Sequence, residues 1–243
     1  MDILVLTATA FEQAALRRSI SHPTTRTFAR RARTEGKLGT RRVVLIETGI
    51  GAVNTAQAVT AALEAGRPDF VLQVGVGGAY AGSRLNLGDL AVATEENDGE
   101  LGVLAPDGWR PADHIGIPVL SKNRIHYNTF PLDADLARRA ATLILEARPD
   151  ATPAVRSGPF VTVQQISGRA ARGNELAARF NAICENMEGA AAAHVCTLYE
   201  VPFVELRGIS NLVEDRDTAA WKLTLASGNA QKAAGVLIEN LAP

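Results

Sequence analysis

The sequence has few of the residues that mark secreted, metal-binding or membrane-spanning proteins. Its 243 residues include two cysteines, Cys184 and Cys196, which are too few for a disulfide framework and lack the paired spacing of a structural zinc site. We therefore expect two reduced, buried thiols. The chain has no run of about 18 apolar residues, and no basic leader precedes its first apolar run. These absences predict a cytoplasmic protein with no membrane partner and no metal site.

The sequence also lacks an excess of charge of either sign. It holds 25 Lys and Arg against 26 Asp and Glu, a formal net charge of -1. A nucleic-acid partner would need a surplus of cations to neutralise its phosphates, so we predict no nucleic-acid binding. Hydrophobic residues make up 47% of the chain, which is typical of a globular protein. The length suits one large α/β domain over residues 1–243 better than two independent domains.

Strand-like and helix-like segments alternate along the chain. Apolar runs bounded by turn residues predict strands at 2–6, 41–47, 69–74, 90–94, 154–166 and 203–209. Helical periodicity predicts helices at 10–18, 53–65, 133–147, 169–180, 188–199 and 218–241. Because buried strands that are apolar on both faces belong to mainly parallel sheets, we expect a three-layer α/β fold with helices on both faces of a mixed, mainly parallel sheet. Residues 95–131 are rich in glycine and proline and are predicted to be an insertion over the sheet edge.

Several polar or glycine-rich segments come directly after strand-like runs. They are Glu12 and the segments 49–51, 75–78, 164–165 and 210–211. In open α/β sheets, ligands bind where loops converge at the carboxyl ends of the strands. We therefore expect these segments to meet around one ligand site.

The glycine turn formed by Gly75, Val76, Gly77 and Gly78 is one candidate for substrate binding. Glycines let the backbone pass close to a ligand and can aim N–H groups at its polar atoms. A plain tight turn is the alternative interpretation. A dinucleotide-cofactor site is disfavoured, because its glycines would follow the first strand and these follow the third. We therefore expect no cofactor.

Glu188 and Asn211 each allow a structural and a functional interpretation. Glu188 begins a predicted helix, where a carboxylate favours the helix dipole, yet a carboxylate can also accept hydrogen bonds from two neighbouring ribose hydroxyls. Asn211 closes the last strand, where it can cap a turn or present its amide to a ligand. His194 lies on an alanine-rich helix and is predicted to be a packed core histidine and not a catalytic base.

Five motifs resemble, in the same order, those of the methylthioadenosine/adenosylhomocysteine nucleosidase family. They are the first strand leading to Glu12 and the segments 47–56 (ETGIGAVNTA), 74–79 (VGVGGA), 187–191 (MEGAA) and 207–211 (RGISN). The resemblance spans nearly the whole chain and is weakest across the insertion at 95–131. It implies a fold of the nucleoside phosphorylase type, a small-molecule nucleoside substrate, and a homo-oligomer, a dimer or larger, that completes its pockets between copies.

The resemblance also implies roles for individual residues. Glu12 would orient and deprotonate the attacking water, and Glu188 would bind the ribose hydroxyls. Met187 would pack against the sugar, and Ile50 would help to wall the pocket. The backbone near Ile166 would contact the edge of the base.

One residue departs from the family pattern. Relatives that release adenine carry Asp at the place of Asn211, where it donates a proton to N7 of the purine. The NH₂ group of Asn211 can instead face the N7 and O6 acceptors of a 6-oxopurine, whereas the amino group of adenine would meet it donor to donor. We therefore predict hydrolysis of the N-glycosidic bond of a 6-oxopurine nucleoside, with release of hypoxanthine.

The nucleophile is predicted to be water. A phosphate nucleophile would need arginines, but the first strand ends in Thr7-Ala8-Thr9-Ala10 and Gln73 precedes the glycine turn. Three alternatives stay open: a methylthioadenosine/adenosylhomocysteine nucleosidase, a purine nucleoside phosphorylase and a nucleoside-binding sensor without activity.

Overall fold

The computed structural model describes residues 2–147, 153–215 and 217–243. Its strands are β1 (Ile3–Thr7), β2 (Ser21–Phe28), β3 (Arg31–Leu38), β4 (Arg41–Glu47), β5 (Phe70–Ala79), β6 (Leu90–Asp98), β7 (Gly102–Ala105), β8 (Gly108–Pro111), β9 (Leu120–Ser121), β10 (Ile125–His126), β11 (Thr129–Pro131), β12 (Val155–Thr162), β13 (Cys184–Asn186) and β14 (Phe203–Leu212). Its helices are α1 (Ala10–Ser19), α2 (Ala52–Ala65), α3 (Ala134–Glu146), α4 (Ala170–Phe180), α5 (Gly189–Tyr199), α6 (Leu223–Asn240) and the short η1 (Ala112–Ile115) and η2 (Thr218–Ala220). In the described part of the chain, no helix is long and apolar enough to cross a membrane.

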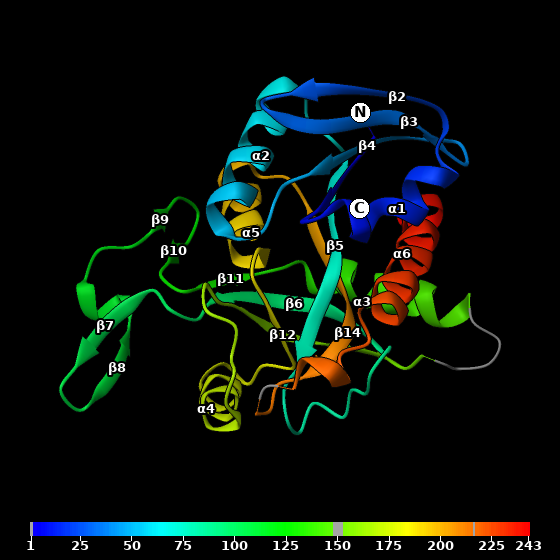
Figure 1. Ribbon diagram of the computed structural model, residues 1–243. Coiled ribbons are helices and arrows are strands. Elements are labelled where there is room, and N and C mark those ends of the chain that lie inside the picture. The colour runs from blue at the N-terminus through cyan, green and yellow to red at the C-terminus, as the bar shows by residue number, and fades with distance from the viewer. Residues whose placement is uncertain (1, 148–152, 216) are drawn as a thin grey trace.

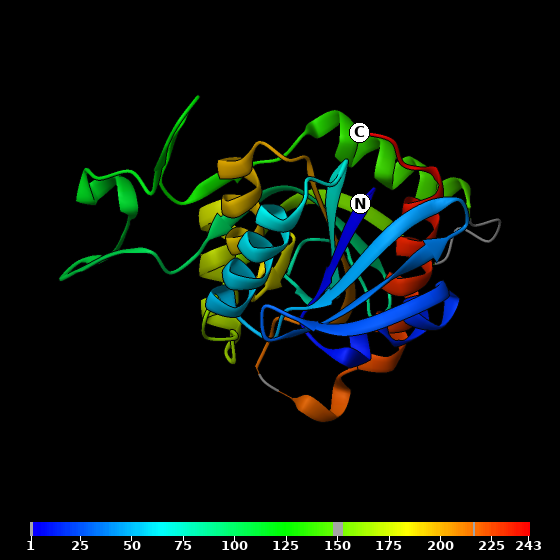
Figure 2. The ribbon, with the colours of Figure 1, turned by 90° about the horizontal axis from the view of Figure 1, so that it is seen from above.

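Helices cover both faces of a central sheet. The spatial order of the strands is β11, β6, β12, β13, β5, β1, β4, β3 and β2, and β14 pairs with both β5 and β6. Buried apolar residues of α1, α3 and α6 pack on one face, and those of α2 and α5 pack on the other (Figures 1 and 2). The pairs β1–β4, β1–β5, β5–β14 and β6–β12 are parallel. The predicted three-layer α/β fold with a mixed, mainly parallel sheet is confirmed.

Five strands of this sheet close into a ring. β5 pairs with β14, β14 with β6, β6 with β12, β12 with β13, and β13 with β5. Asn186 on β13 donates a hydrogen bond of 2.7 Å to Glu96 on β6, although these two strands are not neighbours in the ring. Their side chains therefore reach each other across the inside of the ring, which holds polar groups as well as apolar ones.

The hairpin of β2 and β3 has no counterpart among the predicted elements. All of β2 except Phe28 is exposed, so it lacks the apolar alternation on which the prediction of strands depends. Ala29 and Arg30, both at positive φ, form the two-residue turn of this hairpin. Cys184 and Cys196 are buried free thiols, as predicted.

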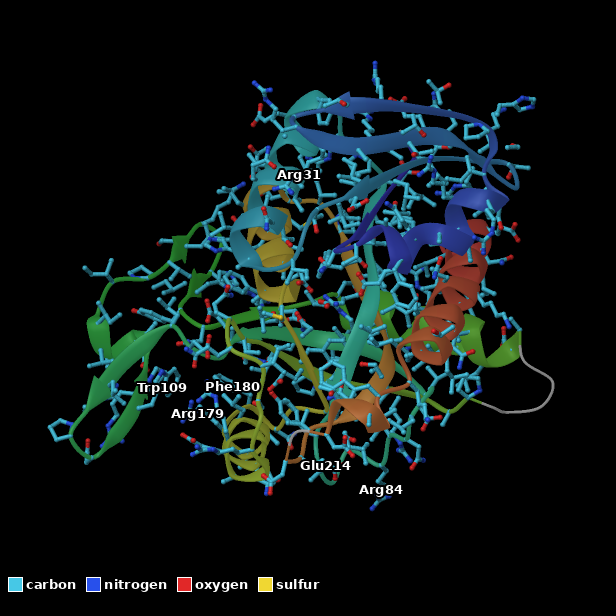
Figure 3. The ribbon with its side chains drawn as sticks, viewed as in Figure 1. Arg31, Arg84, Trp109, Arg179, Phe180 and Glu214 are labelled. Atoms are coloured by element: carbon cyan, nitrogen blue, oxygen red, sulfur yellow. The ribbon has the colours of Figure 1, made fainter. Side chains whose placement is uncertain are left out.

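The glycine- and proline-rich insertion lies only partly over the sheet edge, so that prediction was wrong for most of its length. β11 pairs with β6 at the edge of the sheet, but the segment from β7 to β10 extends away from the body as two small hairpins (Figures 1 and 2). The β7–β8 hairpin touches the body at α4, where the ring of Trp109 meets Phe180 edge to face and lies under the guanidinium of Arg179 (Figure 3). This arm carries exposed apolar side chains such as Leu104, which explains its weak sequence pattern.

His194 does not line the pocket described below, and it packs against a neighbouring ring, but it is half-buried and lies outside the core in which it was predicted. Its ring stacks on Phe130 at 4.7 Å between centroids, and Phe130 also stacks on His126 at 5.3 Å. Burial lowers the pKa of His194 below its ordinary value, and the neighbouring His126 lowers it further. The folded state therefore favours the neutral imidazole of His194.

This preference predicts a pH dependence of stability. Because the unfolded chain binds a proton at His194 below a pH of about 6.5, the free energy of unfolding should fall as the pH drops through that value. His194→Phe keeps a ring against Phe130 and removes the titration, so its melting temperature should fall less between pH 7.5 and pH 5.5 than that of the wild type. The exposed His114→Phe is the control and should follow the wild type. An equal fall in His194→Phe and wild type would contradict the prediction.

Candidate active site

A cavity of about 310 Å³ opens where β1, β5, β13 and β14 end and loops from both halves of the chain meet. This volume is typical of a small-molecule site. The cavity is lined by Ala8, Thr9, Phe11, Glu12, Ile50, Val76, Gly77, Gly78, Ile166, Glu185, Asn186, Met187, Glu188, Arg207, Ser210, Asn211, Trp221 and Leu223. Most of its wall is apolar, and its charged groups are gathered in one part.

The structure brings nine of the ten predicted site residues into this lining. They are Glu12, Ile50, Val76, Gly77, Gly78, Ile166, Met187, Glu188 and Asn211. The tenth, Gly75, lies behind the wall. A Cβ atom at Gly75 would lie 2.6 Å from Nη1 of Arg207 and 2.7 Å from Oε1 of Glu12, closer than real contacts allow. Glycine at this position therefore lets the two charged side chains approach the same stretch of β5.

Glu12 is held in place by its own helix and by the glycine-rich end of β5. The segment 75–78, predicted as a turn after a strand, is itself part of β5. Oε2 of Glu12 accepts hydrogen bonds from the backbone N–H and the hydroxyl of Thr9, at 3.0 and 2.9 Å. Its Oε1 accepts the N–H of Val76 at 2.9 Å. Thr9 and Glu12 thus form the capping arrangement of a helix start, and the same fold-back aims the carboxylate at the cavity. Helix capping and a position at the site are therefore compatible for this residue.

The surroundings of Glu12 favour proton transfer. Burial raises the pKa of the Glu12 carboxyl above its ordinary value, while the positive charge of Arg207 and the N–H of Val76 act in the opposite direction. A carboxylate with a raised pKa is a stronger base than an exposed one. The group is therefore suited to remove a proton from a bound water.

Glu188 points into the same space from the start of α5. Its Oε1 accepts the N–H of Gly51 at 2.9 Å, and its Oε2 accepts Nη2 of Arg207 at 3.1 Å. Arg207 also donates through Nη1 to the carbonyl of Val76 and through Nε to Glu205. Burial alone would lower the pKa of this guanidinium, but the carboxylates of Glu205, Glu188 and Glu12 raise it, so it stays charged.

Asn211 lies at the other end of the cavity, beside the glycine-rich end of β5. Its Oδ1 lies 2.8 Å from the hydroxyl of Ser210, which is also 3.2 Å from the carbonyl of Gly77. The carbonyl of Leu212, which can only accept, is the partner that fixes which side of the amide carries the NH₂ group. Nδ2 of Asn211 donates to this carbonyl at 3.2 Å and keeps one N–H for a ligand. A Cβ atom at Gly78 would lie 3.1 Å from this nitrogen, so the amide lies against the glycine-rich end of β5. This end of the cavity therefore presents a neutral donor.

The mouth of the cavity is apolar. Phe11 and Ile50 are 43% and 57% exposed although both line the cavity, and Trp221 and Leu223 lie in the same wall. Exposed apolar side chains at the rim of a pocket suit an apolar substituent of a ligand or a further protein surface. The polar groups needed for chemistry lie deeper.

Sequence reasoning assigned no role to Arg207, Ser210 or Glu185, which all line the cavity. The sequence feature that could have revealed this site is Arg207, because a charged residue inside a buried strand requires a charged or polar partner. Its hydrogen-bond partners come from β5, from β14 and from the residue before α5, so their meeting follows from tertiary structure. Glu185 accepts hydrogen bonds from the backbone N–H of Ser167 and from the hydroxyl of Tyr80.

The chain is similar to known proteins over most of its length. The model of the phosphorylase superfamily matches residues 2–241. Futalosine hydrolase of Thermus thermophilus is 34% identical over 74% of this chain and 73% of its own length, and that of Streptomyces coelicolor is 33% identical over 98% and 95%. The 5'-methylthioadenosine/S-adenosylhomocysteine nucleosidase of Anoxybacillus flavithermus is 31% identical over 91% and 90%. The crystal structure of this nucleosidase from Neisseria meningitidis, in complex with methylthio-immucillin-A, is 25% identical, with a TM-score of 0.85 over 99% of both chains.

The chain therefore belongs to the phosphorylase superfamily, and it is a nucleosidase, an enzyme that hydrolyses N-glycosidic bonds. Relatives of two kinds, futalosine hydrolases and methylthioadenosine/adenosylhomocysteine nucleosidases, match it at similar identity. The family is thus shown, and the two kinds of relative are named for different nucleosides.

Glu12→Gln should abolish most of the activity and keep substrate binding. The amide can still hold a water but cannot take its proton, so kcat should fall by a factor of about 10²–10⁴ with little change in affinity. In the wild type, kcat/KM should fall on the acid side at a pH above the ordinary glutamate pKa of about 4.3, because burial raises the pKa of Glu12. The measurement is release of free base against pH, with the exposed Glu239→Gln as the control. Near-native turnover by Glu12→Gln would leave Glu12 with only its capping role.

Proposed function

We propose that this nucleosidase hydrolyses a 6-oxopurine nucleoside, futalosine, to hypoxanthine and dehypoxanthine futalosine, a step of menaquinone biosynthesis. The observation that carries the proposal is the amide of Asn211. The carbonyl of Leu212 accepts one N–H of this amide, and the other N–H is available to the purine. An N–H donor matches the N7 and O6 acceptors of hypoxanthine and opposes the amino group of adenine.

The carboxylates supply the chemistry at the sugar. When the bond between C1′ of the ribose and the purine breaks, positive charge develops on the sugar and the electron pair of the bond leaves with the base. A water held by Glu12 adds its oxygen to C1′ while Glu12 takes one of its protons. Glu188 accepts the ribose hydroxyls and adds negative charge next to the cationic sugar. The purine leaves with the electron pair of the bond and takes up a proton from solvent water, because the amide of Asn211 cannot deliver one.

Met187, Ile50 and Ile166 are proposed to position the substrate around these groups. Met187 precedes Glu188 and lines the cavity, where its side chain would pack against the ribose. Ile50 would contact the group on the 5′ carbon at the apolar mouth, and the backbone of Ile166 would contact the base. Gly77 and Gly78 at the end of β5 line the cavity together with Asn211, where the purine would lie.

Arg207 favours water over phosphate as the nucleophile. It is the one arginine that the described residues contribute to the lining, and it already donates to Glu188, Glu205 and the carbonyl of Val76. A phosphate near it would also face the carboxylate of Glu12. A phosphate site needs unopposed cationic donors, and this arrangement offers none of them among the residues described.

Methylthioadenosine/adenosylhomocysteine cleavage is the second candidate, because a relative with that name is 31% identical over 91% of the chain. The two candidates share the sugar chemistry and differ at the base. Its adenine would present an amino donor at position 6 to the N–H donor of Asn211, whereas hypoxanthine presents the acceptor O6 there. This residue therefore favours the 6-oxopurine.

We also propose that residues 1–243 act as one domain in a cytoplasmic homo-oligomer, a dimer or larger. Apolar side chains support an oligomer, because Val53 beside the pocket is 83% exposed and Leu104 on the arm is 85% exposed. A second copy that covered the mouth would also exclude water from the substrate. Nothing in the balanced charge of the chain favours a nucleic acid as a further partner.

Incubation with futalosine, inosine and methylthioadenosine tests the substrate directly. We expect hypoxanthine from futalosine, little adenine from methylthioadenosine, and the same rate with and without phosphate. Chromatography of the bases and of the sugar products measures all three. Formation of ribose 1-phosphate compounds, or adenine as the main product, would refute the proposal.

Asn211→Asp tests how the base is recognised. The substitution replaces a donor by a carboxylate, which repels O6 and N7 of hypoxanthine when it is ionised. The rate on the 6-oxopurine nucleoside should fall by a factor on the order of 10² or more, and any gain should appear with the matching 6-aminopurine. Paired nucleosides with the same 5′ group are compared by base release, with Asn240→Asp outside the pocket as the control. An unchanged preference would show that Asn211 does not contact the base.

A further inference from the structure

Behind the cavity, two carboxyl groups lie side by side inside the ring of strands. Glu96 on β6 and Glu205 on β14 are both 0% exposed. A Cβ atom at Gly189 would lie 2.1 Å from Oε1 of Glu96 and 2.3 Å from Oε2 of Glu205, so these oxygens are no farther apart than the sum of the two distances. Only glycine leaves room for this approach. The pair lies directly beside Glu188, the residue that precedes Gly189.

The hydrogen bonds of the two groups indicate where a proton belongs. Glu96 accepts Nδ2 of Asn186 at 2.7 Å and the hydroxyl of Thr162 at 2.8 Å, both neutral donors. Glu205 accepts Nε of Arg207 through Oε1 at 2.8 Å, while its Oε2 is buried without a partner among the described residues. A proton on Oε1 of Glu96 would be donated to this orphan oxygen. Two adjacent buried carboxylates could not both stay ionised.

We propose that Glu96 holds this proton and that ionised Glu205 is a positioning residue, the fixed counter-charge that sets how strongly Arg207 acts on the two carboxylates of the site. This inference rests on the proposed function of Glu12 as the general base. Arg207 stands between Glu205 on its inner side and Glu188 and Glu12 on the side of the cavity. The more Glu205 compensates the charge of Arg207, the more weakly Arg207 attracts the carboxylate of Glu12.

The charged and titratable groups around the pair agree with this division. Burial raises the pKa of Glu96 well above its ordinary value, and Glu205 raises it further. Cys184 on β13 faces the same interior, and burial raises the pKa of its thiol, so it stays neutral. Arg207 is therefore the one cation that the described residues place among these groups, and Glu205 is the carboxylate bonded to its Nε.

Removal of the charge of Glu205 should strengthen the pull of Arg207 on Glu12. Burial, the largest cause of its raised pKa, keeps Glu96 neutral in the absence of the Glu205 charge. The carboxylate of Glu12 would then be stabilised, its pKa would fall, and the enzyme would keep its base ionised at lower pH. Glu205→Gln retains an oxygen that can accept Nε of Arg207, so the arginine can stay in place. Glu96→Gln replaces a neutral acid by a neutral amide of the same shape and changes no charge. Both variants replace one carboxyl by an amide, and only Glu205→Gln removes a charge.

The experiment compares the pH dependence of kcat/KM for wild type, Glu205→Gln and Glu96→Gln, with the nucleoside that the wild type cleaves. We expect the acid limb to move to lower pH by about 0.5 to 1 unit in Glu205→Gln. In Glu96→Gln it should stay in place, whatever happens to the overall rate. If the acid limb moved only in Glu96→Gln, the charged carboxylate would be Glu96 and not Glu205, and the proposal would be wrong. If the acid limb moved in neither variant, or equally in both, the proposal would also be overturned.

Infrared spectra of the whole protein at neutral pH provide a second readout that needs neither activity nor a stable Glu205→Gln protein. The carbonyl stretch of a protonated carboxylic acid should be present in wild type and missing from Glu96→Gln. Its absence from wild type, or its persistence in Glu96→Gln, would overturn the proposal. A wild type without nucleosidase activity would refute the proposed function, while this spectrum would still decide where the proton lies.

Discussion

The buried guanidinium of Arg207 is the group on which the site depends. It is 2% exposed and donates to Glu188 toward the cavity, to Glu205 behind it and to the carbonyl of Val76 on β5. A charge this deep is tolerated only when it is paired and hydrogen-bonded, and breaking a buried pair typically costs about 3–5 kcal/mol. The same ion pairs therefore stabilise the ring of strands and fix the carboxylate proposed to hold the ribose, so that stability and positioning cannot be separated at this residue.

The fold makes this arrangement possible by placing β14 between β5 and β6. Arg207 on β14 is in register with Gly75 on β5, and the missing side chain of that glycine lets Arg207 and Glu12 come close from different elements. Gly189 does the same for Glu96 and Glu205. The charged groups are thus packed against backbone, which moves little, and not against flexible side chains. A site built this way is preorganised before a substrate arrives.

The sequence predicts those parts of the molecule whose cause is local. Strands such as Arg41–Glu47 and helices such as Ala170–Phe180 follow from apolar runs and helical periodicity, and glycine or polar residues after strands mark the cavity. The exposed hairpin of β2 and β3 has no such pattern and stays invisible. Arg207 lies within a predicted motif, yet its function depends on Glu12 and Glu188, which are distant in the chain. Only the closed ring of strands brings these charges together.

The separation of sugar chemistry from base recognition explains how relatives with different substrates can match this chain at similar identity. Glu12, Glu188 and Arg207 form one connected group that faces the ribose in the proposed mechanism, and none of its contacts includes Asn211. Ser210 can donate its hydroxyl equally well to an amide oxygen or to a carboxylate at position 211. An exchange between Asn and Asp there would therefore leave the rest of the site undisturbed and change only what the purine meets. The base preference of such an enzyme can then change through one side chain while the hydrolytic machinery stays the same.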